Sequence, residues 1–225
     1  MRVWLFDIDG TLLVTGGAGQ DAAVLALQDA FQIPASREGV SFAGRTDRAI
    51  NRDLFEKHGI ESSAANWGRF QDAYLKRLEQ LLDQRAGEVL PGVLDLIDRL
   101  ETMPNTHVGL ITGNVRAAAE LKLRRYGIWD RFAFGGYGDE HADRADVARA
   151  ARAAAEQHVA ADVDPSCIWI IGDTGNDVYC ARAIGARVIA VATGQSDMNT
   201  LGLTEPDLLL RDLRDVFNHP HVFAI

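Results

Sequence analysis

Short apolar runs alternate with longer segments in which apolar residues recur every three or four positions. The short runs predict buried strands, and the longer segments predict amphipathic helices. The expected strands cover residues 3–6, 107–111, 168–171, 187–191 and 207–210, with a weaker candidate at 131–134. The expected helices cover residues 93–100, 115–126, 145–157 and 177–184. This alternation is typical of a parallel sheet with helices on both faces, so we expect a Rossmann-like α/β fold.

The segment from residue 15 to residue 90 departs from this pattern, because no convincing strand occurs in it. Helices are expected there at residues 22–31, 48–58 and 66–84. The last helix carries a stripe of large apolar side chains, namely Trp67, Phe70, Tyr74, Leu75, Leu78, Leu81 and Leu82. We interpret this stripe as the core of a helical lobe rather than as a ligand surface. The chain therefore divides into an α/β core domain (residues 1–14 and 91–225) and an inserted α-helical domain (residues 15–90).

Composition narrows the class of protein. The 225-residue chain has a formal net charge of −9 and no block of Lys or Arg, which argues against nucleic-acid or anionic-membrane binding. No apolar run is long enough to span a bilayer, and Asp7 interrupts the first one, so we expect no signal peptide. Cys167, in a strand-like run, and Cys180, in a helix-like one, are expected to be free, buried thiols. We expect a cytoplasmic protein.

Two acidic residues follow the first expected strand. Alternate side chains of a strand point to the same side, so Asp7 and Asp9 share a side whereas Ile8 points to the core. Two carboxylates about 4 Å apart repel each other by about 4 kcal/mol at an effective dielectric constant of about 20. Either one of them holds a proton or a cation lies between them. This strand end is therefore the first candidate for a reactive site.

Polar residues also stand at other expected strand ends and helix starts, where parallel sheets bind ligands. Thr112-Gly113-Asn114 follows one strand and precedes a helix, whose free N–H groups suit an anionic oxygen. Residues 172–177 form an acidic loop after another strand, and residues 138–144 precede a further helix. The acidic residues of the set are Asp7, Asp9, Asp173 and Asp177. Such hard oxygen ligands predict Mg²⁺ as a cofactor.

These motifs together resemble those of the haloacid dehalogenase (HAD) superfamily, chiefly its phosphatases. Residues 7–11 (Asp-Ile-Asp-Gly-Thr) resemble the first motif of the family, residues 112–114 the second, and residues 172–177 the fourth. The helical lobe resembles the cap that these enzymes carry between the first and second motifs, as in the phosphoglycolate-phosphatase-like branch. The resemblance covers the chain in order, and it implies a HAD-like core domain with a helical cap domain.

The third motif departs from the family pattern, which usually has a Lys before the helix that leads to the fourth motif. The lysines of this chain are Lys57, Lys76 and Lys122, and none follows Lys122. Arg144 is the best-placed residue to supply this positive charge to the phosphate oxygens, although Arg and Lys differ in geometry. The alternative is that Arg144 only pairs with Asp139 or Asp143.

The resemblance implies hydrolysis of a small phosphate monoester. Asp7 would be the nucleophile that becomes an aspartyl phosphate. Asp9 would be the general acid and base, with its backbone carbonyl on the metal. Thr112, Gly113 and Asn114 would bind the phosphoryl group. Asp173 would be a further metal ligand, and Asp177 would act through water or by holding Arg144.

A polar loop of the lobe, Gly44-Arg45-Thr46-Asp47, resembles the substrate-facing loop of phosphoglycolate-phosphatase-like members, which implies that Arg45 contacts the distal part of the substrate. An equally plain alternative is that Thr46 or Asp47 caps the next helix. Residues 16–19 are rich in glycine, and we interpret them as a hinge rather than as a nucleotide loop.

Other functions stay open at this stage. A phosphomutase acting on a small sugar phosphate uses the same motifs. A 2-haloacid dehalogenase would not need Asp9 or a metal, so the presence of Asp9 argues against this alternative. A phospho-receiver or a binding module without catalysis is a further alternative. In a receiver, however, the phosphorylated Asp ends the third strand, whereas Asp7 ends the first. The expected partner is a small phosphorylated metabolite, and the protein is expected to be a monomer or a homodimer.

Overall fold

The computed structural model describes residues 1–224. Within that range six parallel strands form one sheet in the order β5-β4-β1-β6-β7-β8. Their bounds are Gly135–Gly136 (β5), Thr106–Ile111 (β4), Arg2–Phe6 (β1), Ile168–Gly172 (β6), Arg187–Val191 (β7) and Leu208–Leu210 (β8). At the carboxyl end of β1, Phe6 is in register with Leu110 of β4 and Ile171 of β6. The predicted parallel sheet is confirmed.

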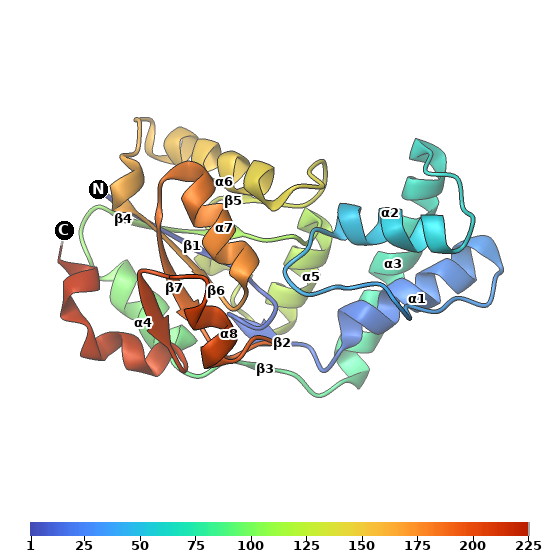
Figure 1. The fold of residues 1–225 in the computed structure, drawn as a ribbon, viewed down its shortest axis with the longest axis horizontal. Coiled ribbons are helices and arrows are strands. Elements are labelled where there is room, and N and C mark those ends of the chain that lie inside the picture. The colour runs from blue at the N-terminus through green and yellow to red at the C-terminus, as the bar shows by residue number, and fades with distance from the viewer. Residues whose placement is uncertain (225) are drawn as a thin grey trace.

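Helices cover both faces of the sheet, as the alternation predicted (Figure 1). Trp4 and Phe6 of β1 point to a layer shared with α4 (Val93–Glu101) and α5 (Arg116–Arg125). Two 3₁₀-helices, Leu213–Asn218 and Pro220–Phe223, close the same layer. Val3 and Leu5 point to the opposite layer with α6 (Arg144–Val159) and α7 (Gly175–Ile184). Trp4 and Trp169 lie in the core, stacked on each other.

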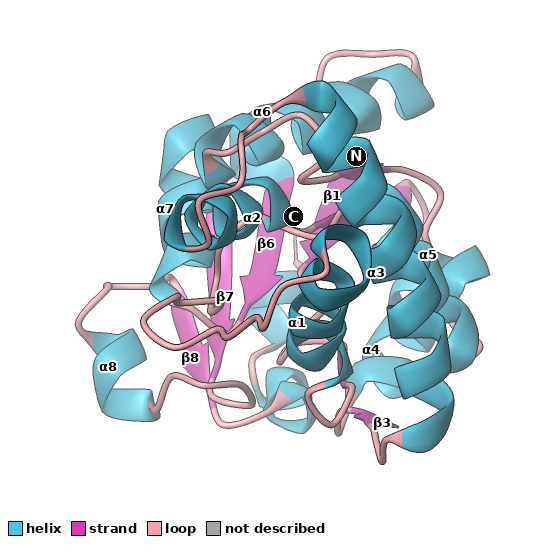
Figure 2. Ribbon diagram, turned by 90° about the vertical axis from the view of Figure 1, so that its right-hand side faces the viewer, coloured by secondary structure: helices cyan, strands magenta, loops and turns pink. Residues whose placement is uncertain are grey.

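The inserted segment is helical. It contains α1 (Ala18–Phe31), α2 (Asp47–Lys57) and α3 (Ala64–Gln84), with α1 packed along α3. Most of the apolar stripe on α3 is buried in this unit, whereas Trp67 and Leu75 are half-buried. Viewed from the cap side, α1 and α3 stand in front of the strands (Figure 2). Val115 and Ala118, at the start of α5, complete the same apolar cluster, so the cap packs on the core domain.

Four details differ from the expectations. The weak strand at 131–134 is wrong, because a 3₁₀-helix occupies Trp129–Arg131 and the edge strand is Gly135–Gly136. Glycine is needed there, since a Cβ on Gly136 would lie 2.4 Å from the carbonyl oxygen of Val147, and glycines give no apolar strand signal. Cys167 is also half-buried in a 3₁₀-helix, not buried in a strand, whereas Cys180 is buried; both are free.

The third difference lies where the chain leaves and re-enters the core domain. Leu13–Val14 (β2) pairs antiparallel with Glu88–Val89 (β3), although no strand was expected between residues 15 and 90. Two-residue strands are too short to produce a periodic pattern, so only the tertiary pairing reveals them. The domain boundaries at 14/15 and 90/91 stay predictions. One short helix, α8 (Met198–Gly202), was not expected either.

Among residues 1–224, none of the helices combines the length and the apolar character needed to cross a membrane.

Candidate active site

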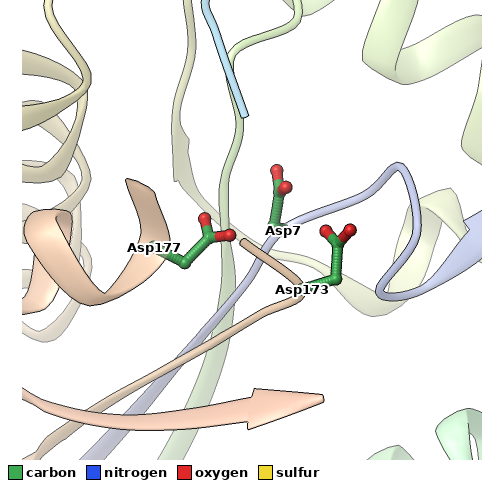
Figure 3. A group of neighbouring side chains, drawn as sticks. All are labelled: Asp7, Asp173 and Asp177. Atoms are coloured by element: carbon green, nitrogen blue, oxygen red, sulfur yellow. The ribbon is translucent and has the colours of Figure 1, made fainter. Parts of the chain in front are cut away.

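A group of buried carboxylates lies at the carboxyl edge of the sheet. Asp7 directly follows β1, Asp173 directly follows β6, and Asp177 lies in the first turn of α7 (Figure 3). One carboxylate oxygen from each residue lies within 4.8 Å of the others, and no side chain of the group is more than a tenth exposed. The parallel register of β1 and β6 brings the first two together, because the strands end at the same edge.

Burial disfavours the charged form of these carboxylates. It raises the pKa of Asp7 to about 7, although Arg144 opposes the shift. Burial and the neighbouring carboxylates of Asp177 and Asp7 raise the pKa of Asp173 to about 8. Carboxyl oxygens held this close, with raised pKa values, need a proton or a cation between them. An all-oxygen donor set fits a hard divalent cation.

Asp177 is tied to protein donors through both of its oxygens. The Nη2 group of Arg144 donates to Oδ1. The backbone N–H of Thr174 (3.1 Å) and its hydroxyl (2.8 Å) donate to Oδ2 and close the capping box of α7. These bonds compete with direct coordination and favour the prediction that Asp177 holds Arg144.

Arg144 starts α6 and is 5% exposed. Its Nη1 lies 3.7 Å from Oδ1 of Asp7, and it does not pair with Asp139 or Asp143 in the described part of the chain. Burial lowers the pKa of Arg144, but Asp7 and Asp177 more than offset this effect, so its net pKa lies above the ordinary value. Its Nε is buried and has no hydrogen-bond partner within residues 1–224.

The loop after β4 forms another wall. Thr112 is fully buried, and its hydroxyl oxygen accepts hydrogen bonds from the backbone N–H (3.2 Å) and Nδ2 (2.8 Å) of Asn114. Nδ2 of Asn114 also donates to Oδ2 of Asp9 at 2.7 Å. Gly113 and Asn114 line the adjoining cavity, whereas Thr112 lies behind them. Thr112 as a phosphoryl ligand stays a prediction.

Asp9 is not a member of the acidic cluster; it lines the cavity beside it, and its side chain is 46% exposed. Its Oδ2 accepts from Nζ of Lys122 at 2.6 Å, and the same ammonium donates to Oδ1 of Asn114 at 2.6 Å. Lys122 projects from α5 and is 3% exposed, which is rare for a lysine without a charged partner. The side chain of Asp9 is therefore positioned by a buried cation and an amide.

The cap loop docks against this wall through the segment that precedes α2. The backbone N–H of Asp47 donates to the carbonyl of Gly113 (2.7 Å), and Oδ2 of Asp47 accepts from the N–H of Val115 (2.8 Å). The approach is close, since a Cβ on Gly113 would lie 2.1 Å from the carbonyl oxygen of Arg45. Burial raises the pKa of Asp47 to about 6, although Lys122 and the Val115 N–H oppose the shift.

Arg45 lines the cavity, but its guanidinium group binds other residues of the cap. Its Nη2 lies 2.7 Å from Oδ2 of Asp53, and it also donates to the carbonyls of Ser41 and Ala49. The hydroxyl of Thr46 accepts from the Ala49 N–H at 3.1 Å, so the expectation that this loop caps the next helix is confirmed for Thr46. Substrate contact by Arg45 stays a prediction.

Cap and core together line a cavity of about 400 Å³ that is partly open to solvent. Asp7, Asp173 and Arg144 line its core side, and residues of α1, α2 and α3 line its cap side. The glycines at positions 16, 17 and 19 also face it, beside the β2–β3 pairing.

Residues 4–182 match the family model of the haloacid dehalogenase-like hydrolases. The chain belongs to this family. A protein of Dickeya dadantii named "Probable phosphatase IndB" is 25% identical over 223 residues, covering 96% of this chain and 92% of the relative. A phosphoglycolate phosphatase of Chromobacterium violaceum is 28% identical over 221 residues, covering 95% of this chain and 93% of the relative.

Among solved structures, CbbY from Rhodobacter sphaeroides in complex with phosphate superimposes with a TM-score of 0.74 at 19% identity, covering 96% of each chain. This likeness and the family match confirm the predicted HAD fold and hydrolase class.

The sequence pattern did not predict that Lys122 binds Asp9 and Asn114 in this HAD hydrolase. A usable signal existed, because Lys122 stands two helical turns after Asn114 on the expected helix, among apolar residues. A lysine on a buried helix face calls for an acidic partner nearby. Spacing alone does not reveal that the partner is Asp9.

In the metal-free protein, we expect the free energy of unfolding to fall as the pH rises from about 5 to about 8. The pKa values of Asp7, Asp47 and Asp173 are raised above the ordinary value of an aspartate, so the folded state keeps protons that the unfolded state has already lost. Urea unfolding in EDTA at several pH values measures this. A divalent cation should restore more stability at pH 8 than at pH 5.

Asp173→Asn should flatten the fall in stability, whereas the exposed control Asp98→Asn should leave it unchanged. A pH slope that is equal in the wild type and in Asp173→Asn contradicts the expected linkage.

Proposed function

We propose that this protein is a Mg²⁺-dependent phosphatase that hydrolyses a small phosphate monoester through an aspartyl phosphate on Asp7. The observation that carries this proposal is the position of Asp7. It lies buried at the core side of the cavity, beside Asp173 and facing the guanidinium of Arg144. A nucleophile, a metal site and a cation for phosphate oxygens thus share one cavity. The names of the curated relatives support the same chemistry.

The metal would be held by the carboxylates of Asp7 and Asp173 and by the backbone carbonyl of Asp9. Asp177 would not bind the metal directly but would act through water or by holding Arg144, since its oxygens bind Arg144 and Thr174. Mg²⁺ is the preferred ion because the donors are oxygens and because Mg²⁺ keeps water and phosphate among its ligands. When bound, the ion neutralises phosphoryl charge and the repulsion between the carboxylates.

The reaction has two displacement steps. A carboxylate oxygen of Asp7 attacks phosphorus, the bond from phosphorus to the substrate oxygen breaks, and Asp9 gives that oxygen a proton. Asp9 then takes a proton from a water molecule, whose oxygen attacks phosphorus and releases Asp7 and inorganic phosphate. Arg144, the Thr112 hydroxyl and the Gly113 N–H hold the phosphoryl oxygens, because this reaction depends mainly on positioning and charge neutralisation.

Lys122 and Asn114 act through Asp9. Their bonds to Oδ2 of Asp9 hold its carboxyl group at the rim of the acidic cluster, on the cavity side. A carboxyl group that must give a proton to the leaving oxygen and then take one from a water at the same place gains from such fixed placement.

The expected partner is a small phosphorylated metabolite. A cytoplasmic location and a monomeric or homodimeric state stay predictions.

The purified protein is expected to hydrolyse p-nitrophenyl phosphate when Mg²⁺ is added. EDTA should abolish turnover, and Asp7→Asn should remove it while thermal unfolding stays cooperative, because the amide is not a nucleophile. The exposed cap substitution Asp72→Asn serves as the control. Full activity in EDTA, or in Asp7→Asn, refutes the proposed mechanism.

Arg144→Ala is expected to lower kcat/KM by about 10²-fold or more, because the phosphoryl group loses its fixed cation. Arg149→Ala, on the same helix with a side chain that is 60% exposed, is the matched control. Steady-state kinetics of both variants decide the point. A loss of only a few-fold in Arg144→Ala removes Arg144 from the third-motif role.

Lys122→Met is expected to lower kcat by about tenfold to a hundredfold, since Asp9 loses the bond that orients it. Lys122→Arg should recover part of the loss by restoring a cation. Lys76→Met, an exposed lysine of the cap, is the control. Wild-type kcat with only a raised KM in Lys122→Met would instead make Lys122 a substrate-binding residue.

A further inference from the structure

The cap side of the cavity presents polar groups that the proposed hydrolysis does not use. Asn51 of α2 and Tyr74 of α3 line the cavity, and each is 5% exposed. Within residues 1–224, neither the Asn51 amide nor the Tyr74 hydroxyl has a hydrogen-bond partner. Buried polar groups are usually paired, so unpaired ones at a cavity wall point to a ligand or to bound water.

Asp47 adds an acceptor to these neutral groups. Its Oδ2 accepts from the Val115 N–H, whereas Oδ1 has no hydrogen-bond partner in the described part of the chain. Asp47 lies one helical turn before Asn51 on α2, so both project from the same face of that helix. Tyr74 lies close enough for Asp47 to add to the rise in its pKa, which burial dominates, so its hydroxyl remains a donor.

The positive charges of the cavity are already engaged. Arg45 pairs with Asp53, Lys122 with Asp9, and Arg144 with Asp7 and Asp177. Among the described residues that line the cavity, no cation is left without a carboxylate partner. Arg144 lies on the core side, where the phosphoryl group would bind, and the cap-side cation Arg45 is paired with Asp53. A carboxylate on the leaving group would therefore meet no unpaired cation on the cap side, and it has no proton to give to Asp47. A hydroxyl group both donates and accepts, which suits Asp47, Asn51 and Tyr74 together.

We propose that the leaving group of the substrate is an uncharged alcohol with further hydroxyl groups, a polyol or a sugar, which Asp47, Asn51 and Tyr74 bind. This inference rests on the proposed phosphatase function and specifies its substrate class. The inference argues against phosphoglycolate as the substrate, because the leaving group of phosphoglycolate carries a carboxylate. Phosphoglycolate is the substrate in the name of the Chromobacterium violaceum relative. A cavity of about 400 Å³ is of the size that encloses such a small ligand.

The first test compares kcat/KM of the wild-type protein on defined phosphate esters. The hydroxylated set is glycerol 3-phosphate, erythrose 4-phosphate, ribose 5-phosphate and glucose 6-phosphate; the others are phosphoglycolate, phosphoethanolamine and p-nitrophenyl phosphate. At least one hydroxylated ester should exceed both phosphoglycolate and phosphoethanolamine by about tenfold or more, on the order of one or two hydrogen bonds. Phosphoglycolate or phosphoethanolamine as the best ester overturns the inference. No turnover of any ester, p-nitrophenyl phosphate included, refutes the phosphatase function instead.

The second test assigns the preference to the cap residues. Tyr74→Phe and Asn51→Ala should lower kcat/KM for the best hydroxylated ester by about fivefold to tenfold each. Turnover of p-nitrophenyl phosphate, whose leaving group has no further hydroxyl, should change less than about threefold. Tyr179→Phe and Arg52→Ala, both on exposed side chains, are the controls. Equal losses on both esters overturn the inference, and Tyr74→Phe, which keeps the ring, guards against a folding defect.

Discussion

The mutual repulsion of buried carboxylates is the constraint on which the rest of this structure depends. Asp7, Asp173 and Asp177 lie within one small volume, and Arg144 is the buried cation that faces both Asp7 and Asp177. Burying charge without compensation is costly, so raised pKa values, the capping bonds on Asp177 and a site suited to a divalent cation belong together. Under the proposed function, a bound divalent cation would supply the positive charge that these carboxylates need.

Cap docking makes the edge of the sheet one wall of a cavity. Asp47 binds the start of α5 through the Val115 N–H, and Gly113 lets the Arg45 backbone approach the loop after β4. The two sides of the cavity differ in chemistry: the core side carries the acidic cluster and Arg144, whereas the cap side carries Asn51 and Tyr74. Under the proposed function, the core side would bind the phosphoryl group and the cap side the leaving group.

Much of the fold was predictable because strand and helix periods are local properties of the sequence. Apolar runs at residues 3–6, 107–111 and 168–171 identified the central strands, and acidic residues at their ends identified Asp7 and Asp173. Gly135–Gly136 escaped prediction because its pairing depends on close approach to α6, not on side-chain pattern. The half-burial of Cys167 likewise depends on a turn that Pro165 begins before β6.

By itself, the sequence determined the order of the elements, the helical insertion and the types of residue available for chemistry. Tertiary structure alone decided which of these residues meet. It placed Lys122 rather than the acidic cluster against the Asp9 side chain, engaged Arg45 with Asp53, and left Asn51 and Tyr74 unpaired in the cavity. The physical reason is that packing brings together side chains that are distant in the sequence: Lys122 reaches Asp9 only because α5 packs beside the carboxyl end of β1.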